Sequence, residues 1–182
     1  KSTDIAFKLL KERKKIIENS LDEKEKKEES ESLVVDVKEF WRSRNLTERQ
    51  EMDFLELFQP LLDEFDFIRR AERLFWDGRY QDGERMYRFI PLNYRMLFAA
   101  VAKINQKPKY INNILRTVPR EMRDQEILLY SRLKYYHNNK NTNEVVNLLE
   151  KPYYASEHQE DWFKYRKLYA RELLKLASYK KA

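Results

Sequence analysis

The stretch from Arg69 to Tyr80, which reads RRAERLFWDGRY, contains an abrupt stop between two amphipathic segments. Apolar side chains recur before the stop at three- and four-residue spacing, at Phe67, Ala71 and Leu74, which is typical of one helix face. Gly78 follows at the position where a helix C-terminus favours a residue that tolerates positive φ. Because the apolar pattern restarts at once, we expect two helices that fold back on each other across a very short connection.

Turn-forming residues are scarce in the rest of the chain, which has 2 glycines and 5 prolines among 182 residues. A sheet would need many more of them, so the sequence predicts an all-α protein. The hydrophobic content of 42% is enough for a sizeable core. The apolar pattern and its breaks predict one helix that ends at residue 77, before Gly78. They predict further helices over residues 3–19, 33–43, 47–59, 80–89, 93–104, 108–115, 124–138, 142–151 and 157–178.

Local signals predict how some of these helices begin and which faces they bury. Thr47 and Gln50 have the spacing of a capping box, and Asp124 is placed to cap the helix that follows it. The apolar stripes that we expect to face the core consist of Ile5, Leu9, Leu10, Ile16 and Ile17 in the first helix, Met52, Leu55 and Phe58 or Leu57 in the helix at 47–59, and Trp162, Phe163, Tyr169 or Ala170, Leu173 and Leu174 in the last.

Residues 22–32 are almost entirely charged residues and serine, which fits either a solvated helix extension or a mobile linker. We interpret them as a poorly packed connection. The expected organisation is therefore an N-terminal helix with a charged linker at 1–32 and a helical domain at 33–182. The last residues resemble the first turn of another helix, so we expect a domain that is truncated at both ends.

Pro91, Pro119 and Pro152 fall at intervals close to the roughly 34-residue period of helix-hairpin repeats. This spacing favours an irregular α-solenoid, or superhelix, of stacked antiparallel helix pairs. An ordinary globular helix bundle is the alternative architecture.

The formal charge of +6 is concentrated in residues 33–182, because residues 1–32 carry equal numbers of each sign. A basic surface favours anionic partners in general, whether nucleic acid, lipid headgroups or a cell-wall polymer, and its charge density does not choose among them. The sequence contains no cysteine, which excludes disulfide and thiolate chemistry, and no apolar run long enough to span a bilayer.

No pattern in the chain predicts a cofactor or a metal ion. His137 and His158 are isolated, and Gly78 and Gly83 lie in helix-turn context rather than in a phosphate-binding loop. A group of aromatic residues near Arg132 is explained either as core or as a platform for stacking sugars or bases. The residues that we select from it as ligand-contact candidates are Arg132, Tyr153 and Tyr154.

The order Arg-x-x-Arg-Leu-bulky-Trp-x-Gly-Arg from Arg70 to Arg79 resembles the α-superhelical domain of soluble lytic murein transglycosylases. Similar positions occur from Val37 to Ala182, although Gly83 stands where that family usually has alanine. The residues that carry the resemblance as family-signature structural positions are Trp41, Arg70, Arg73, Leu74, Trp76, Gly78, Arg79, Pro119, Arg132, Trp162 and Arg171.

The resemblance implies a periplasmic protein whose parent cleaves peptidoglycan glycan strands, with a helical domain that positions the strand or supports the catalytic domain. The family's catalytic glutamate lies in a Glu-Ser pair, but Glu29-Ser30 and Glu31-Ser32 lie in the charged segment without the family's second motif. We therefore expect no catalytic residue on this chain. The expected partners are the glycan strand and the protein's own catalytic domain.

A second hypothesis is a helical-repeat scaffold that binds a protein partner. Nucleic-acid binding by the basic face is a third interpretation, and nucleic acid is not among the expected partners.

Overall fold

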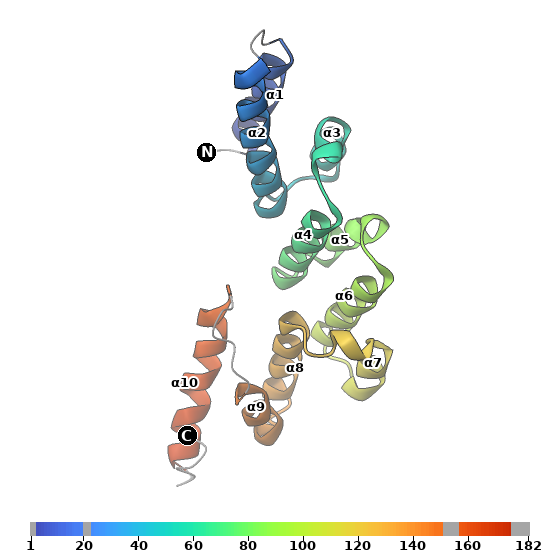
Figure 1. The fold of residues 1–182 in the computed structure, drawn as a ribbon. Coiled ribbons are helices and arrows are strands. Elements are labelled where there is room, and N and C mark those ends of the chain that lie inside the picture. Colours follow the sequence, from blue (N-terminus) through green and yellow to red (C-terminus); the bar gives the residue numbers. More distant parts are fainter. Residues whose placement is uncertain (1–2, 20–22, 151–156, 176–182) are drawn as a thin grey trace. The chain divides into compact units, whose positions relative to one another are not determined.

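The computed structural model describes residues 3–19, 23–150 and 157–175, and these residues form helices and connections without any strand (Figure 1). The all-α prediction is confirmed. The chain divides into two compact units, Lys1–Arg95 and Met96–Ala182, and the boundary falls within α6, Leu92–Asn105. Each unit is described by itself. None of the described helices is both long and apolar enough to cross a membrane.

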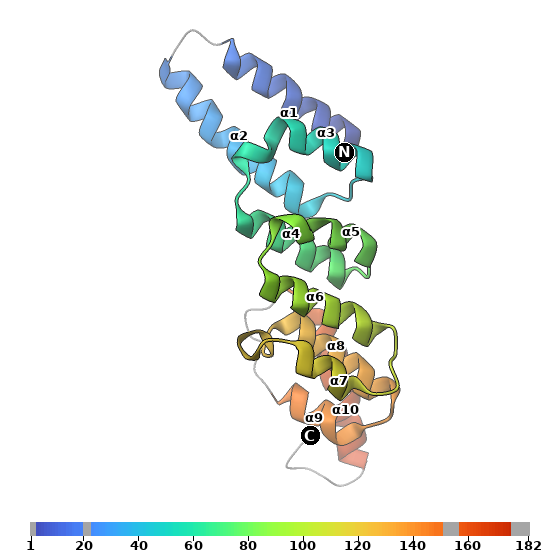
Figure 2. The same cartoon turned by 90° about the vertical axis from the view of Figure 1, so that its right-hand side faces the viewer.

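The first unit is built around α2 and α4. α1 packs along α2, α2 also contacts α4, and α4 in turn contacts α5 and the 3-10 turn that follows it (Figure 2). The elements of this unit are α1 (Thr3–Glu18), α2 (Glu23–Ser43), α3 (Glu48–Phe58), a 3-10 turn at Gln59–Leu61, α4 (Glu64–Trp76), α5 (Tyr80–Glu84) and a 3-10 turn at Arg85–Phe89.

An aromatic cluster joins the first three helices. The ring of Phe54 on α3 lies 5.1 Å from that of Phe40 and 5.3 Å from that of Trp41, both on α2. Phe7 of α1 lies 5.6 Å from Phe54 and 6.4 Å from Phe58. Because these side chains are at most 8% exposed, their burial is a main source of stability for this unit.

The position of Phe7 corrects the predicted face of the first helix. The buried apolar residues of α1 are Phe7, Leu10 and Ile17, whereas Ile5, Leu9 and Ile16 are exposed. The predicted stripe was right for Leu10 and Ile17 and wrong for Ile5, Leu9 and Ile16, and it left out Phe7. The prediction for Met52 is also wrong, because α3 turns Phe54, Leu55 and Phe58 inward and leaves Met52 exposed.

Residues 23–32 are the first half of α2 and not a poorly packed connection. Arg13 of α1 reaches across to this part of the chain, where its guanidinium lies 3.0 Å from the Glu29 carboxylate and also pairs with Asp36. Charged residues of both signs can form a solvated helix because pairs three or four positions apart attract each other. The solvated helix extension was therefore the correct alternative.

The helix starts were predicted with mixed success. Thr47 caps α3 and forms the full capping box with Gln50, as expected. Asp63 forms a second capping box at the start of α4, which the prediction missed. Asp124 does not occupy the cap position of α8 (Glu126–Asn138), because the first helical hydrogen bonds are accepted by the carbonyl of Gln125.

The stop at Gly78 has the predicted geometry. Gly78 has a φ of 75°, and its amide donates to the carbonyl of Phe75 while the amide of Arg79 donates to that of Leu74. This pair of hydrogen bonds is a Schellman motif, which satisfies carbonyls at the end of α4. The next predicted helix is shorter than expected, because α5 ends at Glu84 and continues as a 3-10 turn.

The second unit has its own core between α8, α9 and α10. The elements are the rest of α6, α7 (Ile111–Thr117), a 3-10 turn at Arg120–Met122, α8, α9 (Thr142–Leu149) and α10 (Gln159–Lys175). Its buried cluster contains Leu129, Leu133, Val145, Val146, Leu148, Trp162, Tyr169 and Leu173. The predicted ends of the last two helices at 151 and 178 lie outside the described residues.

Gly83 is required by the ring of Phe75. A Cβ atom added at Gly83 would lie 2.4 Å from Cε2 of Phe75, which is buried in the core. This contact gives a physical reason for glycine at a position where alanine would otherwise favour the helix by about 1 kcal/mol.

We predict that Gly83→Ala lowers the free energy of unfolding by about 1–3 kcal/mol, because the ring must shift within a packed core. Chemical denaturation of the full chain measures this change. Glu84→Ala, at the exposed neighbouring position, is the control and should have little effect. Adding Phe75→Leu to Gly83→Ala should cost less than the sum of the two single changes, and strict additivity would contradict the proposed clash.

Candidate functional site

The residue at the centre of the first unit is Arg70 of α4, whose side chain is 0% exposed. Its Nη1 donates to the carbonyl oxygen of Trp41 at 2.5 Å and to that of Arg44 at 2.9 Å. Its Nη2 lies 3.3 Å from Oε2 of Glu51, and the guanidinium carbon lies 4.2 Å from the centre of the Trp41 ring. A single buried cation thus contacts the end of α2, the loop after it and α3.

Glu51 is the counterion of this arginine. It is 1% exposed and also accepts from Arg85, whose Nε lies 3.1 Å from Oε1. Burial lowers the pKa of Arg70 to about 10, and the charge of Glu51 opposes that change. The guanidinium therefore stays protonated at neutral pH, and the cluster is an ion pair with two cations around one carboxylate.

Arg73 extends the same arrangement by one helical turn. Its Nε donates to the carbonyl of Arg42 at 2.6 Å, and its Nη1 donates to Oδ1 of Asn45 at 2.8 Å. The last carbonyls of a helix have no partner within the helix. Arg70 and Arg73 supply partners for those of Trp41 and Arg42, so two side chains of α4 cap the C-terminus of α2.

Asp66 forms a second buried ion cluster beside the first. It is 0% exposed and accepts from Nε of Arg42 at 2.7 Å, while Nζ of Lys38 lies 3.1 Å from its Oδ2. Glu51 and Asp66 are the buried carboxylates of the described residues, and each contacts two cations. Neither is placed as a free acid in a cleft.

The other signature residues have separate positions. Leu74 is buried, Trp76 is half-buried, and Nε of Arg79 donates to Asp82 at 2.6 Å. In the second unit Trp162 is 1% exposed, and its Nε1 donates to Oε1 of Glu126 at 2.7 Å, so it belongs to the core. Pro119 and Arg132 are half-buried and Arg171 is exposed. The ligand-contact candidates Tyr153 and Tyr154 lie outside the described residues.

A polar hollow of about 640 Å³ lies in the second unit beside α7 and the end of α8. Tyr110 at its edge is 63% exposed, and the hydroxyl of Tyr135 donates to the carbonyl of Lys109 at 3.3 Å. Its lining consists of tyrosines, asparagine amides and a few charges: Lys109, Tyr110, Ile111, Asn112, Asn113, Arg116, Tyr135, Tyr136, Asn139, Asn141 and Glu144. Exposed aromatic faces beside amide groups can stack on and hydrogen-bond to a neutral polar ligand.

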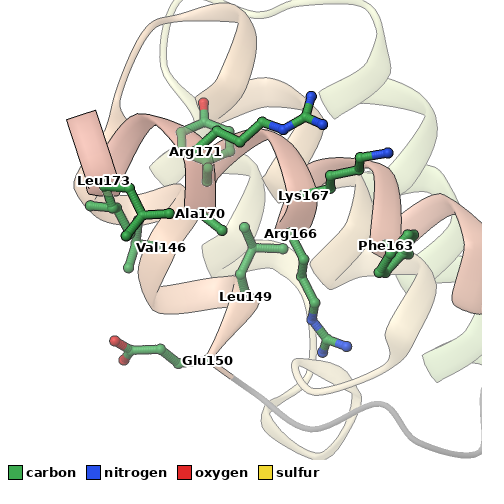
Figure 3. A pocket seen from close by; sticks show the side chains of 11 residues that line it. Val146, Leu149, Glu150, Phe163, Arg166, Lys167, Ala170, Arg171 and Leu173 are labelled. Carbon is green, nitrogen blue, oxygen red and sulfur yellow. The ribbon is translucent and has the colours of Figure 1, made fainter. Parts of the chain in front are cut away.

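An apolar groove of about 520 Å³ lies between α9 and α10 (Figure 3). Phe163 lies at one end and Leu173 at the other, with Leu149 between them. The charged side chains in its lining are Glu150, Arg166, Lys167 and Arg171. The prediction for α10 is right for Trp162, Tyr169 and Leu173, which occupy its core face, and wrong for Phe163 and Leu174, which are exposed.

The two histidines do not form a metal site. Nδ1 of His137 lies 2.9 Å from the hydroxyl of Tyr169, which makes His137 part of the α8–α10 contact. No group of three or more possible metal ligands occurs within residues 3–19, 23–150 and 157–175.

Comparisons of the chain with protein-family models, with curated proteins and with solved structures gave no match.

We predict that Glu51→Gln lowers the free energy of unfolding by about 3 kcal/mol or more, because it leaves the buried Arg70 charge without its counterion. Urea denaturation of the full chain is the measurement. Glu12→Gln, which breaks the exposed pair with Lys15, is the control and should leave stability nearly unchanged. Equal effects of the two substitutions would show that the buried pair has no special role.

Proposed function

We propose that this chain is a non-catalytic helical domain of a periplasmic peptidoglycan lytic transglycosylase, which positions the glycan strand or supports the catalytic domain. The observation that carries the proposal is the role of Arg70 and Arg73. Both belong to the segment that resembles that family, and together they cap the end of α2. A sequence pattern that corresponds to one packed feature is stronger support than scattered matching positions.

The same proposal includes an α-solenoid of stacked antiparallel helix pairs. The contacts of α1 with α2 in the first unit, and of α8 with α9 in the second, support it. In such an array each pair buries its apolar face against its neighbours, and the outer faces stay available for ligands.

A supporting role fits the chemistry of the described carboxylates. A glycosidase-type general acid needs a protonated carboxyl group with a raised pKa beside a substrate cleft. Glu51 and Asp66 instead contact two cations each, and Glu29 of the Glu-Ser pairs lies on the solvated face of α2 in an ion pair with Arg13. These groups are placed for stability rather than for proton transfer.

The polar hollow beside α7 is the surface that best suits a glycan strand. Sugar rings present apolar faces that stack on tyrosine, and hydroxyl and acetamido groups that pair with amides. Tyr110 and the asparagine side chains of the hollow provide both kinds of contact.

The α9–α10 groove favours a second candidate function, a scaffold that binds a protein partner. Phe163 and Leu174 are more than half exposed beside an apolar floor, and such surfaces often bind partner helices.

We predict that the full chain co-sediments with purified peptidoglycan and releases no anhydromuropeptides from it. Tyr110→Ala should reduce the bound fraction several-fold, because it removes the exposed ring of the hollow. Phe163→Ala is the matched control, since Phe163 has the same 63% exposure but lies in the other surface.

Turnover of peptidoglycan would contradict the non-catalytic role. Failure to sediment, together with capture of one protein partner that Phe163→Ala abolishes and Tyr110→Ala does not, would support the scaffold function instead.

A further inference from the structure

Three arginines line one small hollow of the second unit. The hollow has a volume of about 330 Å³ and lies beside α7 and α8. Arg116 comes from α7, Arg123 follows the 3-10 turn at 120–122, and Arg132 comes from α8. The other lining residues are Asn112, Leu115 and Leu128.

The charge of this hollow is not balanced by the residues around it. No carboxylate is among its lining residues, and within the described part of the chain none of the three arginines forms an ion pair. Nε of Arg123 donates to the carbonyl of Val118 at 3.1 Å, which fixes that side chain. Nε of Arg132 is buried and has no hydrogen-bond partner. Three positive charges gathered around one hollow without a carboxylate in its lining are unfavourable in the absence of an anion.

We infer that this hollow binds an oxyanion, the terminal carboxylate or phosphate group of a ligand. A guanidinium presents paired N–H donors that match two oxygens of such a group, and three of them from different elements can surround it. Leu128 is buried and Leu115 is half-buried beside them, so the local medium is less polar than water and strengthens each contact.

The neighbouring surface indicates that the anion belongs to a larger molecule. Asn112 and Arg116 line both this hollow and the polar hollow that contains Tyr110. The two spaces therefore adjoin along α7. A ligand held by its oxyanion at the arginines can place the rest of its structure against the tyrosines and amides.

The inference does not depend on the proposed function. It rests on three arginines that line one hollow without a carboxylate among them, and it holds for an anionic metabolite as well as for a charged part of a polymer.

The test is a titration of the full chain at constant ionic strength, with inorganic phosphate in one arm and acetate in the other. The arginine Nε–H signals are followed by nuclear magnetic resonance. We expect saturable shifts of the Arg132 signal in at least one arm. Saturation by phosphate alone identifies a phosphoryl ligand, and saturation by acetate identifies a carboxylate.

Substitutions locate the site. Arg116→Gln should weaken the binding about tenfold, because it removes a charge-assisted contact from an exposed position that does not support the core. Arg132→Gln, followed through the Nε–H signal of Arg123, should weaken it similarly. Arg120→Gln, which removes an exposed charge from the same loop but not from the lining, should change it less than about twofold.

The inference is overturned if neither anion gives saturable shifts, or if Arg120→Gln weakens binding as much as Arg116→Gln. The sedimentation assay reports on the proposed function separately. Anion binding without peptidoglycan binding would support this site and contradict the glycan-binding role. Peptidoglycan binding without anion binding would support the glycan-binding role and contradict this site.

Discussion

The first unit depends on a guanidinium group that is completely buried. Arg70 contacts two backbone carbonyls, the Trp41 ring and the Glu51 carboxylate, so it joins α4 to the end of α2 and to α3. A buried charge is costly unless it is paired with an opposite charge and hydrogen-bonded. Once it is paired, its partners can hardly move without exposing an unbalanced charge. This requirement fixes the connection between α2 and α3. The aromatic cluster of Phe7, Phe40 and Phe54 joins these two helices to α1.

The two units differ in how their charged and polar side chains are paired. In the first, the two buried carboxylates are held by cations, Glu51 by Arg70 and Arg85 and Asp66 by Lys38 and Arg42. In the second, polar side chains gather around open hollows, and the three arginines of the smaller hollow have no acidic partner in the described residues. Arginine therefore stabilises the fold in the first unit and, by our inference, binds a ligand in the second. An arginine with a counterion holds the fold, and an arginine without one is available to a ligand.

The sequence predicted the helical class, the stop at Gly78 and the capping box at Thr47, because each depends on neighbours in the chain. It identified Leu10 and Ile17 of the buried face of α1 but not Phe7, since the aromatic partners of Phe7 from α2 and α3 bring that side chain into the core. Arg70 lies three residues after Phe67 and four before Leu74, on the apolar stripe of its helix, and an arginine at such a position indicates a buried partner. That the partner is Glu51 could not be predicted, because the pairing depends on how α3 and α4 pack. Arg132 was selected as a ligand-contact candidate. Arg116 and Arg123 were not, because the sequence does not show that they line the same hollow as Arg132.

A double-mutant cycle measures how strongly the Arg70–Glu51 pair holds the first unit together. The free energies of unfolding of the wild type, Arg70→Met, Glu51→Gln and the double variant give the coupling between the two side chains. We expect a coupling of about 2 kcal/mol or more, because Glu51→Gln leaves the buried Arg70 without its counterion and Arg70→Met leaves the buried Glu51 with Arg85 alone. A coupling below about 0.5 kcal/mol, the range of independent sites, would contradict it.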